Sequence, residues 1–212
     1  MVGKIAVVGG TGNLGAAIAC RLAKAGHSVV IGSRSAESAE RAAGELGCGL
    51  IGKSNADAAK EADLIIVTVP FAAQEGTLTD IAPHCAGKIV VDTTVPLVPP
   101  KVMRVQLPAE GSAAQRAQNL LGEGVNVVSA FHNVGAAKLA ANEDLNCDVL
   151  VFGDDKASRE QVVQLSEAMG LRAFHAGALC NSAAAEALTS VLIFINKNYD
   201  VGEAGIKITG KS

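Results

Sequence analysis

Three glycines, Gly10, Gly12 and Gly15, have the spacing of a phosphate-binding turn. They form a G-x-G-x-x-G pattern that follows the apolar run 5–8 and opens a helical pattern. The first glycine permits a tight turn, the second lets the backbone approach a pyrophosphate, and the third lets the helix pack on the strand. In a chain with 23 glycines the pattern alone could be an incidental turn, but the flanking strand and helix favour a dinucleotide site. The expected contacts at the helix N-terminus are Gly10, Thr11, Gly12, Asn13 and Leu14.

The residues after the second expected strand decide which dinucleotide binds. NAD sites usually carry Asp or Glu there, about 20 residues after the glycines, to accept hydrogen bonds from the ribose hydroxyls. This chain has Ser33 and Arg34 instead. A guanidinium binds a 2′-phosphate through two charge-assisted hydrogen bonds, and a serine hydroxyl adds a donor, whereas a carboxylate would repel that phosphate. We therefore predict NADP rather than NAD, the alternative being that Arg34 is a solvated surface cation.

A second segment that could do chemistry is the run 129–137, where a strand leads into His132 and Asn133 and then into small residues. Small side chains after a strand let a flat ring approach the backbone closely. His132 could donate a hydrogen bond to a substrate carbonyl or a developing anion, or it could be a satisfied structural histidine. Asn133 is an equally good donor and could instead cap a helix. Both are candidates for orienting a substrate.

No convincing proton-transfer group accompanies these residues. The Ser-x-x-x-Tyr-x-x-x-Lys grouping of short-chain dehydrogenases is missing, since Tyr199 is the only tyrosine. A hydride can pass between two planar redox rings held face to face without a strong protein acid or base, because positioning and exclusion of water supply most of the catalysis. The sequence suits that kind of reaction and assigns no catalytic acid or base.

Seven apolar runs that alternate with helical patterns predict the strands that position these residues. Such alternation is typical of a Rossmann-type α/β fold with a doubly wound, mostly parallel sheet. The run 64–69 is almost continuously apolar, as expected of a central strand covered on both faces. Because ligands bind at the carboxyl edge of such sheets, Thr68, Val69 and Pro70 are expected at the ligand site. The expected strands cover residues 4–8, 28–32, 64–69, 88–92, 126–131, 148–152 and 171–175.

The later part of the chain contains a long connection and an expected C-terminal helix. The connection from 92 to 111 holds four prolines, which is typical of a functional lip or lid. The Ala- and Leu-rich segment 181–198 predicts an amphipathic helix. We divide the chain into a dinucleotide-binding domain at 1–153 and a small C-terminal part at 154–212 that completes the acceptor cleft. Helix starts are expected at Ser54 or Asn55, at Ser112 with Gln115, and at Ser158 with Gln161.

Composition and charge argue against several other classes of protein. The formal net charge is −3, and the dispersed Lys and Arg residues form no basic patch for nucleic acid. No apolar stretch approaches the roughly 20 residues needed to cross a bilayer, and the first strand begins too early for a signal peptide, so we expect a cytoplasmic protein with no membrane contact. The five cysteines lack disulfide or zinc spacing and are expected to be small core residues. We predict no bound metal.

More specific motifs follow the glycine turn along nearly the whole chain. They are Gly-Ser-Arg at 32–34, Thr-Val-Pro at 68–70, Val-Pro-Leu-Val-Pro at 95–99, Ser-Ala-Phe-His at 129–132, Gly-Asp-Asp at 153–155, Ala-Gly at 176–177 with Asn-Ser at 181–182, and Gly-Glu-Ala-Gly-Ile-Lys at 202–207. With these motifs in this order, the chain resembles the NADPH-dependent reductases of the deazaflavin coenzyme F420. The total length agrees as well.

The resemblance implies a set of binding residues and a reaction. NADP would lie on residues 11–14 and on Ser33 and Arg34, with its nicotinamide near Val69, Pro70 and Ala136. The deazaflavin would stack beside the 95–99 loop, His132 and the C-terminal helix. A hydride would then pass directly between nicotinamide C4 and deazaflavin C5, in either direction. Reductases of this family are similar in being homodimers, so a homodimer is implied here too.

Some positions depart from the pattern of the family. Ser38 stands where members can have a Lys four residues after the phosphate-binding Arg, so one phosphate contact is missing. Phe71 replaces Trp after the strand-end proline, and Gly135 and Ala178 replace Pro around the acceptor pocket. Cytosolic domains of membrane ferric reductases, which pass hydride to a flavin, resemble the family too. FAD or FMN, a small carbonyl substrate, or a non-catalytic NADP-binding sensor therefore remain as alternatives.

Overall fold

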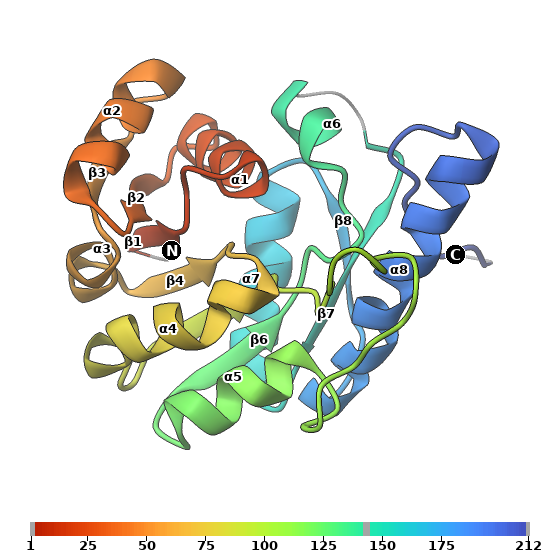
Figure 1. Ribbon diagram of the computed structural model, residues 1–212. Coiled ribbons are helices and arrows are strands. Elements are labelled where there is room, and N and C mark those ends of the chain that lie inside the picture. Colours follow the sequence, from red (N-terminus) through yellow and green to blue (C-terminus); the bar gives the residue numbers. More distant parts are fainter. Residues whose placement is uncertain (1–2, 142–144, 211–212) are drawn as a thin grey trace.

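A computed structural model describes residues 3–141 and 145–210 and contains an eight-stranded sheet in the order β3-β2-β1-β4-β5-β6-β7-β8 (Figure 1). The chain runs outward from β1 to β3, then returns to the other side of β1 at β4. This reversal leaves a crevice between β1 and β4 where ligands bind in doubly wound sheets. The strands are β1 (Lys4–Val8), β2 (Ser28–Ser33), β3 (Ile51–Ser54), β4 (Leu64–Val67), β5 (Ile89–Asp92), β6 (Asn126–Ser129), β7 (Asp148–Gly153) and β8 (Arg172–His175).

The expected Rossmann-type, mostly parallel sheet is confirmed, with two differences in its strands. β3 was not expected from the sequence, since it is a four-residue edge strand whose Ile51 is half exposed and whose Gly52 has no side chain. β7 pairs antiparallel with β6, while all other pairs are parallel. Apolar periodicity cannot report strand direction, because both pairings alternate side chains in the same way.

Helices cover both faces of the sheet (Figure 1). Alternate residues of β1 explain the two-sided core, because Ile5 and Val7 face one apolar cluster with α1, whereas Ala6 and Val8 face another with α3 and α4. The helices are α1 (Asn13–Lys24), α2 (Ala36–Leu46), α3 (Asn55–Glu61), α4 (Phe71–Ile81), α5 (Ala113–Leu121), α6 (Ala136–Ala141), α7 (Lys156–Ala168) and α8 (Ser182–Tyr199), with short 3-10 turns η1 (Ala82–His84) and η2 (Leu179–Asn181).

Two of the three expected helix caps are confirmed. Ser54 caps α3, and the Ser112 hydroxyl accepts a hydrogen bond from Gln115 N at 3.0 Å at the start of α5. The expectation for Ser158 was wrong, because the carboxylate of Asp155 accepts from Ser158 N at 2.6 Å and caps α7. A carboxylate is the stronger acceptor and also favours the positive end of the helix dipole.

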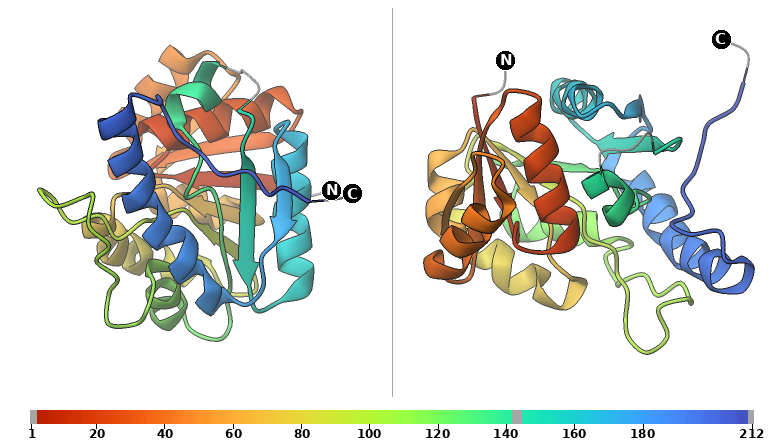
Figure 2. Two further views of the ribbon diagram at one scale, coloured as in Figure 1. Left: turned by 90° about the vertical axis from the view of Figure 1, so that its right-hand side faces the viewer. Right: turned by 90° about the horizontal axis from the view of Figure 1, so that it is seen from above.

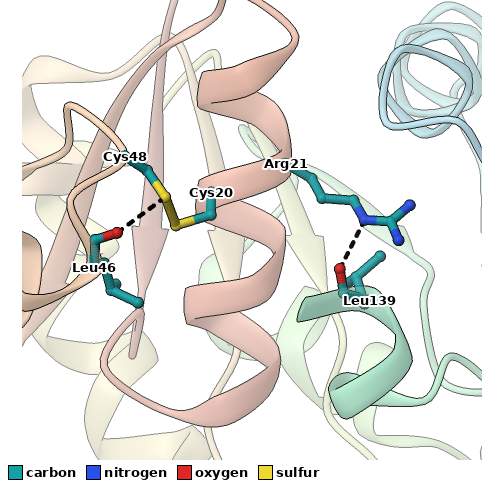
Figure 3. The surroundings of a disulfide bond; sticks show 5 residues. All are labelled: Cys20, Arg21, Leu46, Cys48 and Leu139. Carbon is teal, nitrogen blue, oxygen red and sulfur yellow. Dashed lines mark hydrogen bonds between the residues drawn. A yellow bond between two sulfur atoms is a disulfide. The ribbon is translucent and has the colours of Figure 1, made fainter. Parts of the chain in front are cut away.

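Cys20 of α1 and Cys48 after α2 form a disulfide, with 5.4 Å between their Cα atoms (Figure 3). The expectation that the cysteines are core residues was therefore wrong for this pair and for Cys180, which is exposed, whereas Cys85 is buried. The two positions are 28 residues apart in sequence, and only the packing of α1 beside the turn between α2 and β3 brings them together. Spacing alone carries no sign of such a contact.

The C-terminal helix α8 confirms the expected helix at 181–198. It also corrects the expectation that no apolar stretch approaches the length needed to cross a bilayer. With η2 it forms a 21-residue segment, Leu179–Tyr199, whose mean hydropathy of 1.4 and length would suffice to cross a membrane. One face packs on the protein through Glu186, Ser190 and Leu192, while Val191 and Phe194 are exposed. The division of the chain after residue 153 stays a prediction.

Candidate functional site

The sheet register brings the expected cofactor segments together at one edge. Val8 pairs with Gly32 on one side and with Val67 on the other, so the residues that follow β1, β2 and β4 emerge side by side. The Gly10 amide donates to the Gly32 carbonyl at 3.0 Å, which joins the glycine turn to the end of β2. The turn, Ser33 with Arg34, and the 68–70 segment therefore lie together as one candidate site.

The three glycines have three different surroundings. A Cβ at Gly10 would lie 2.6 Å from the Val7 carbonyl oxygen, and one at Gly15 would lie 2.4 Å from Thr68 Oγ1. A Cβ at Gly12 would meet only the Gly9 carbonyl oxygen, at 3.5 Å. The first and third glycines are therefore required by the protein's own packing. Gly12 has room on the protein side, so packing does not require its lack of a side chain, and its role in the approach of a ligand stays a prediction.

The N-terminus of α1 presents backbone groups without a protein cap. Gly12 precedes the helix in an extended conformation and makes no side-chain capping bond, and Thr11, Gly12 and Asn13 are all exposed. Leu14 is half-buried and packs against the core. The amides of the first turn and the positive end of the dipole are thus available to a pyrophosphate.

Asn55 supports the glycine turn from below, a role that sequence reasoning missed. Its side chain is buried, and its Oδ1 accepts a hydrogen bond from Gly9 N at 3.3 Å. It was expected only as a possible helix cap, but Ser54 takes that place. The close approach of Asn55 Oδ1 to Gly32 also requires that no Cβ be present there.

Ser33 ends β2 next to the glycine turn, and Arg34 follows it. Ser33 is half-buried and Arg34 is exposed. Ser35 rather than Ser33 caps α2, since the Ser35 hydroxyl accepts from Ser38 N at 3.2 Å. Within the described ranges Arg34 takes part in no ion pair or side-chain hydrogen bond, so its guanidinium can bind an added phosphate without breaking a contact. That it does so stays a prediction.

The segment after β4 packs against the glycine turn as expected. Thr68 Oγ1 donates to the Val8 carbonyl at 2.9 Å, and a Cβ at Gly9 would lie 2.6 Å from Val69 Cγ1. Pro70 is exposed and precedes α4, where its missing N–H costs no helical hydrogen bond. Val69 and Pro70 are thus placed at the rim of the crevice, where the nicotinamide was expected.

His132 is buried and uncharged. Its Nε2 lies 2.9 Å from the Ser129 hydroxyl, and burial lowers its pKa to about 4. The preceding residue, Phe131, has a φ of 68°, a left-handed conformation that turns the chain sharply after β6. At neutral pH the imidazole is therefore uncharged, and it could orient a hydride acceptor only through a hydrogen bond. Whether His132 orients a substrate in this way or is purely structural stays a prediction.

Asn133 and Ala136 are held by the C-terminal part. Asn133 Nδ2 donates to the Ala185 carbonyl of α8 at 3.3 Å, and because α6 begins only at Ala136, Asn133 is not its N-cap. The Glu203 carboxylate accepts from Ala137 N at 3.0 Å and Lys138 N at 2.8 Å, which fixes the first turn of α6 where Ala136 lies. Sequence reasoning missed Glu203, although the 202–207 motif contains it. A cavity of about 150 Å³ lies between residues 132–135 and α8.

Buried Arg21 fixes α1 on the side opposite the disulfide (Figure 3). Its guanidinium donates to the carbonyls of Leu139 at 2.8 Å and Met169 at 3.0 Å. These bonds satisfy the charged group, whose pKa burial lowers. α1, whose N-terminus follows the glycine turn, is thus anchored to α6 and to the end of α7, which keeps the glycine turn and the 133–138 segment in a fixed relation.

Comparisons with known proteins agree with this arrangement. The family model described as NADP oxidoreductase, coenzyme F420-dependent, matches residues 4–96. An F420-dependent NADP reductase of Methanothermobacter thermautotrophicus is 40% identical over 99% of this chain and 96% of its own length. The metalloreductase STEAP3 of Rattus norvegicus is 31% identical over 84% of this chain and 35% of its own length. The crystal structure of a protein assigned as an F420-dependent NADP reductase of Arthrobacter sp. FB24 has a TM-score of 0.86 at 26% identity and covers 98% of this chain and 99% of that one.

Proposed function

The chain belongs to the family of coenzyme F420-dependent NADP oxidoreductases, and we propose that it transfers a hydride directly between NADP(H) and F420. The observation that carries the proposal is the constellation at the crevice, which combines an open Gly12 with a helix N-terminus and an exposed Arg34 that have, among the described residues, no side-chain cap and no ion-pair partner respectively. The similarity to F420-dependent NADP reductases, which extends over nearly the full length of the chain, supports the same assignment.

The residues present fit NADP(H). The first-turn amides of α1 would hold the pyrophosphate, while Ser33 and Arg34 would hold the 2′-phosphate as donor and charged fork. Val69, Pro70 and Ala136 would lie against the nicotinamide. When bound, NADP(H) and the deazaflavin supply the hydride donor at one ring and the hydride acceptor at the other.

The protein's contribution to the reaction is positioning. The crevice residues Val69 and Pro70 are fixed by Thr68 against the glycine turn, and Ala136 is fixed through Glu203. Neutral His132 and Asn133 border the cavity beside α8 and have hydrogen-bonding groups but no charge there. Holding two rings in contact and excluding water accounts for catalysis without a protein acid or base.

Mixing the purified protein with NADPH and oxidised F420 tests this function. The deazaflavin absorbance should fall in step with NADPH oxidation, and NADH at the same concentration should react far more slowly. Absence of F420 reduction above the enzyme-free rate, with NADPH binding intact, would contradict the proposal.

A flavin in place of F420 is a second candidate acceptor. Phe71 and Gly135 depart from the family pattern; Phe71 directly follows Pro70 at the start of α4, and Gly135 lines the cavity beside α8. The relation to a metalloreductase indicates kinship with a reductase of another acceptor. NADPH oxidation that needs FMN or FAD and not F420 would establish this candidate. Efficient turnover of any acceptor would exclude a non-catalytic sensor.

We also propose a homodimer in which α8 lies at the contact. The outer side of α8 exposes Val191 and Phe194, and Tyr199 is 74% exposed at its end. An adjoining apolar groove of about 730 Å³ is lined by Phe152, Phe174 and Leu188 among others. Glu186 holds the inner face of α8 on the protein, so the helix is not free to be surrounded by lipid. We therefore expect a second copy of the chain, rather than a membrane, to bury the outer face. A monomeric mass in sedimentation would contradict this.

A cytoplasmic location is proposed as well. Cys180 is an exposed free thiol, which is typical of a reducing compartment. The Cys20–Cys48 disulfide argues for a less reducing one. Trapping thiols in freshly lysed cells and counting those at positions 20 and 48 tests the proposal directly, because a cytoplasmic enzyme should show this pair at least partly reduced.

A further inference from the structure

A buried polar network outside the dinucleotide site holds both ends of the loop 93–112. This loop joins β5 to α5, contains the 95–99 segment, and projects beside α8 (yellow-green and blue in Figures 1 and 2). Three side chains from three elements meet there: Asp92 at the end of β5, Gln74 in α4 and Glu186 in α8, each at most 1% exposed. None was singled out from the sequence.

The start of the loop is fixed by Asp92. Its Oδ1 accepts hydrogen bonds from Thr94 N at 3.2 Å and Thr94 Oγ1 at 2.6 Å, and its Oδ2 accepts from Gln74 Nε2 at 2.7 Å. The same Gln74 nitrogen donates to the Ala113 carbonyl at 2.9 Å. Because both partners are acceptors, the amide orientation is determined. Gln74 therefore ties the beginning of the loop to its end.

The end of the loop is fixed by Glu186. Its carboxylate accepts from Ala113 N at 2.7 Å and from Ala114 N at 3.1 Å, the first amides of α5. One turn earlier in α8, Ser182 Oγ donates to Ser112 Oγ at 2.9 Å. A negative charge at a helix N-terminus is favourable, and charge-assisted hydrogen bonds are the stronger kind. α8 thus clamps the point where the loop becomes helix.

Burying the carboxylates of Glu186 and Asp92 costs desolvation free energy. Desolvation raises the pKa of Glu186 to about 7 and that of Asp92 to about 6, despite the hydrogen bonds that each accepts. Gln74 Oε1 is buried without a hydrogen-bond partner in the described structure. Buried charged groups are often replaceable by apolar side chains of equal volume without loss of stability. We therefore expect the network to place the loop 93–112 rather than to raise the free energy of unfolding.

We propose that Glu186 is a positioning residue for the hydride acceptor, because it fixes the loop 93–112 against α8 and thereby the 95–99 segment, beside which the acceptor is proposed to stack. The inference rests on the proposed function, since F420 is the proposed acceptor. The hydrogen bonds of Glu186 go to α5, whereas the residues that would hold NADP(H) follow β1, β2 and β4, apart from Ala136 at the start of α6. Loss of the clamp should therefore affect the two substrates unequally.

Glu186→Gln tests the proposal with a side chain of nearly the same shape. The oxygen of the introduced side-chain amide can accept from one of the two backbone N–H groups of α5. Its NH2 group is a donor and therefore repels the other N–H group. The KM for F420 should rise about tenfold, equivalent to about 1.4 kcal/mol, while the KM for NADPH changes less than about twofold. Glu75→Gln is the matched control, because exposed Glu75 also contacts α5, through its ion pair with Arg116. The control should leave both KM values unchanged.

Hydrogen exchange separates the failure of this inference from failure of the proposed function. Amides in residues 97–111 should exchange faster in Glu186→Gln than in the wild type, and not in Glu75→Gln, whether or not F420 is the substrate. Unchanged exchange, or equal changes in both KM values of a folded variant, would overturn the positioning role. If Glu186→Gln does not fold, Ser182→Ala removes one hydroxyl contact and should shift exchange and the F420 KM in the same direction; no shift would overturn the inference too.

Discussion

Replacing Arg34 by Ala should separate NADPH from NADH. The side chain is exposed and free of ion pairs in the described structure, so its removal breaks no contact of the fold. Hydrogen bonds to charged groups contribute about 1.5–3 kcal/mol. Because solvent screens an exposed guanidinium, we take the lower part of this range, about 1.5–2 kcal/mol. The Kd for NADPH should therefore rise roughly 10- to 30-fold.

The assay is titration of each nucleotide by fluorescence or calorimetry at one ionic strength. The Kd for NADH should change less than about twofold, because NADH has no 2′-phosphate. Arg41→Ala is the matched control, since Arg41 is an exposed cation of α2, the helix that follows Arg34, and lies beyond its first turn. Arg34→Lys keeps the charge but not the bidentate fork, and should fall between wild type and Arg34→Ala. Equal losses for NADPH and NADH would refute the reasoning and indicate a structural role for Arg34.

Three further perturbations test the fold and the site. Gly12→Ala should leave the melting temperature unchanged and weaken NADPH more than about tenfold, whereas Gly15→Ala should destabilise the protein, because its Cβ would lie 2.4 Å from a side-chain oxygen of the strand-end Thr68. Reducing the 28-residue disulfide ring, or Cys48→Ser, should lower the free energy of unfolding by up to about 3–4 kcal/mol in denaturant titrations; an unchanged midpoint in reductant would show the pair unbonded. Because burial lowers the pKa of His132 to about 4, the unfolded chain binds an extra proton there below the ordinary pKa of 6.5. The contribution of His132 to stability should therefore fall from pH 6.5 toward 4, opposite in sign to those of Asp92 and Glu186, and the stability of wild type relative to His132→Asn should fall with it.

The parts of the site that depend on local pattern could be predicted from the sequence. Gly10 and Gly15 have the packing that the fingerprint requires, and Gly12 has the open surroundings. Ser33 and Thr68 emerge at one sheet edge because parallel strands of similar length end together. The capping residues, read together with the helical periodicity after them, also predicted the starts of α3 and α5 correctly. Each of these features is a property of a few neighbouring residues.

The features that could not be predicted depend on contacts between distant residues. Asn55 bonds to Gly9 across 46 positions, and Glu186 bonds to Ala113 across 73. Neither residue type is unusual where it stands, and no spacing reports its partner. The Cys20–Cys48 pair belongs to the same class. The antiparallel direction of β7 likewise depends on how the chain returns to the sheet, not on its apolar alternation.

The central claim is direct hydride transfer between two rings held in one crevice, and isotope transfer measures it. NADPH carrying deuterium at C4 should be prepared in both stereochemical forms and incubated with the protein and oxidised F420 in ordinary water. One form should deliver its deuterium to C5 of the deazaflavin, visible as one added mass unit in the reduced product. Deuterium lost to solvent from both forms, or taken up at C5 from heavy water with unlabelled NADPH, would contradict the account.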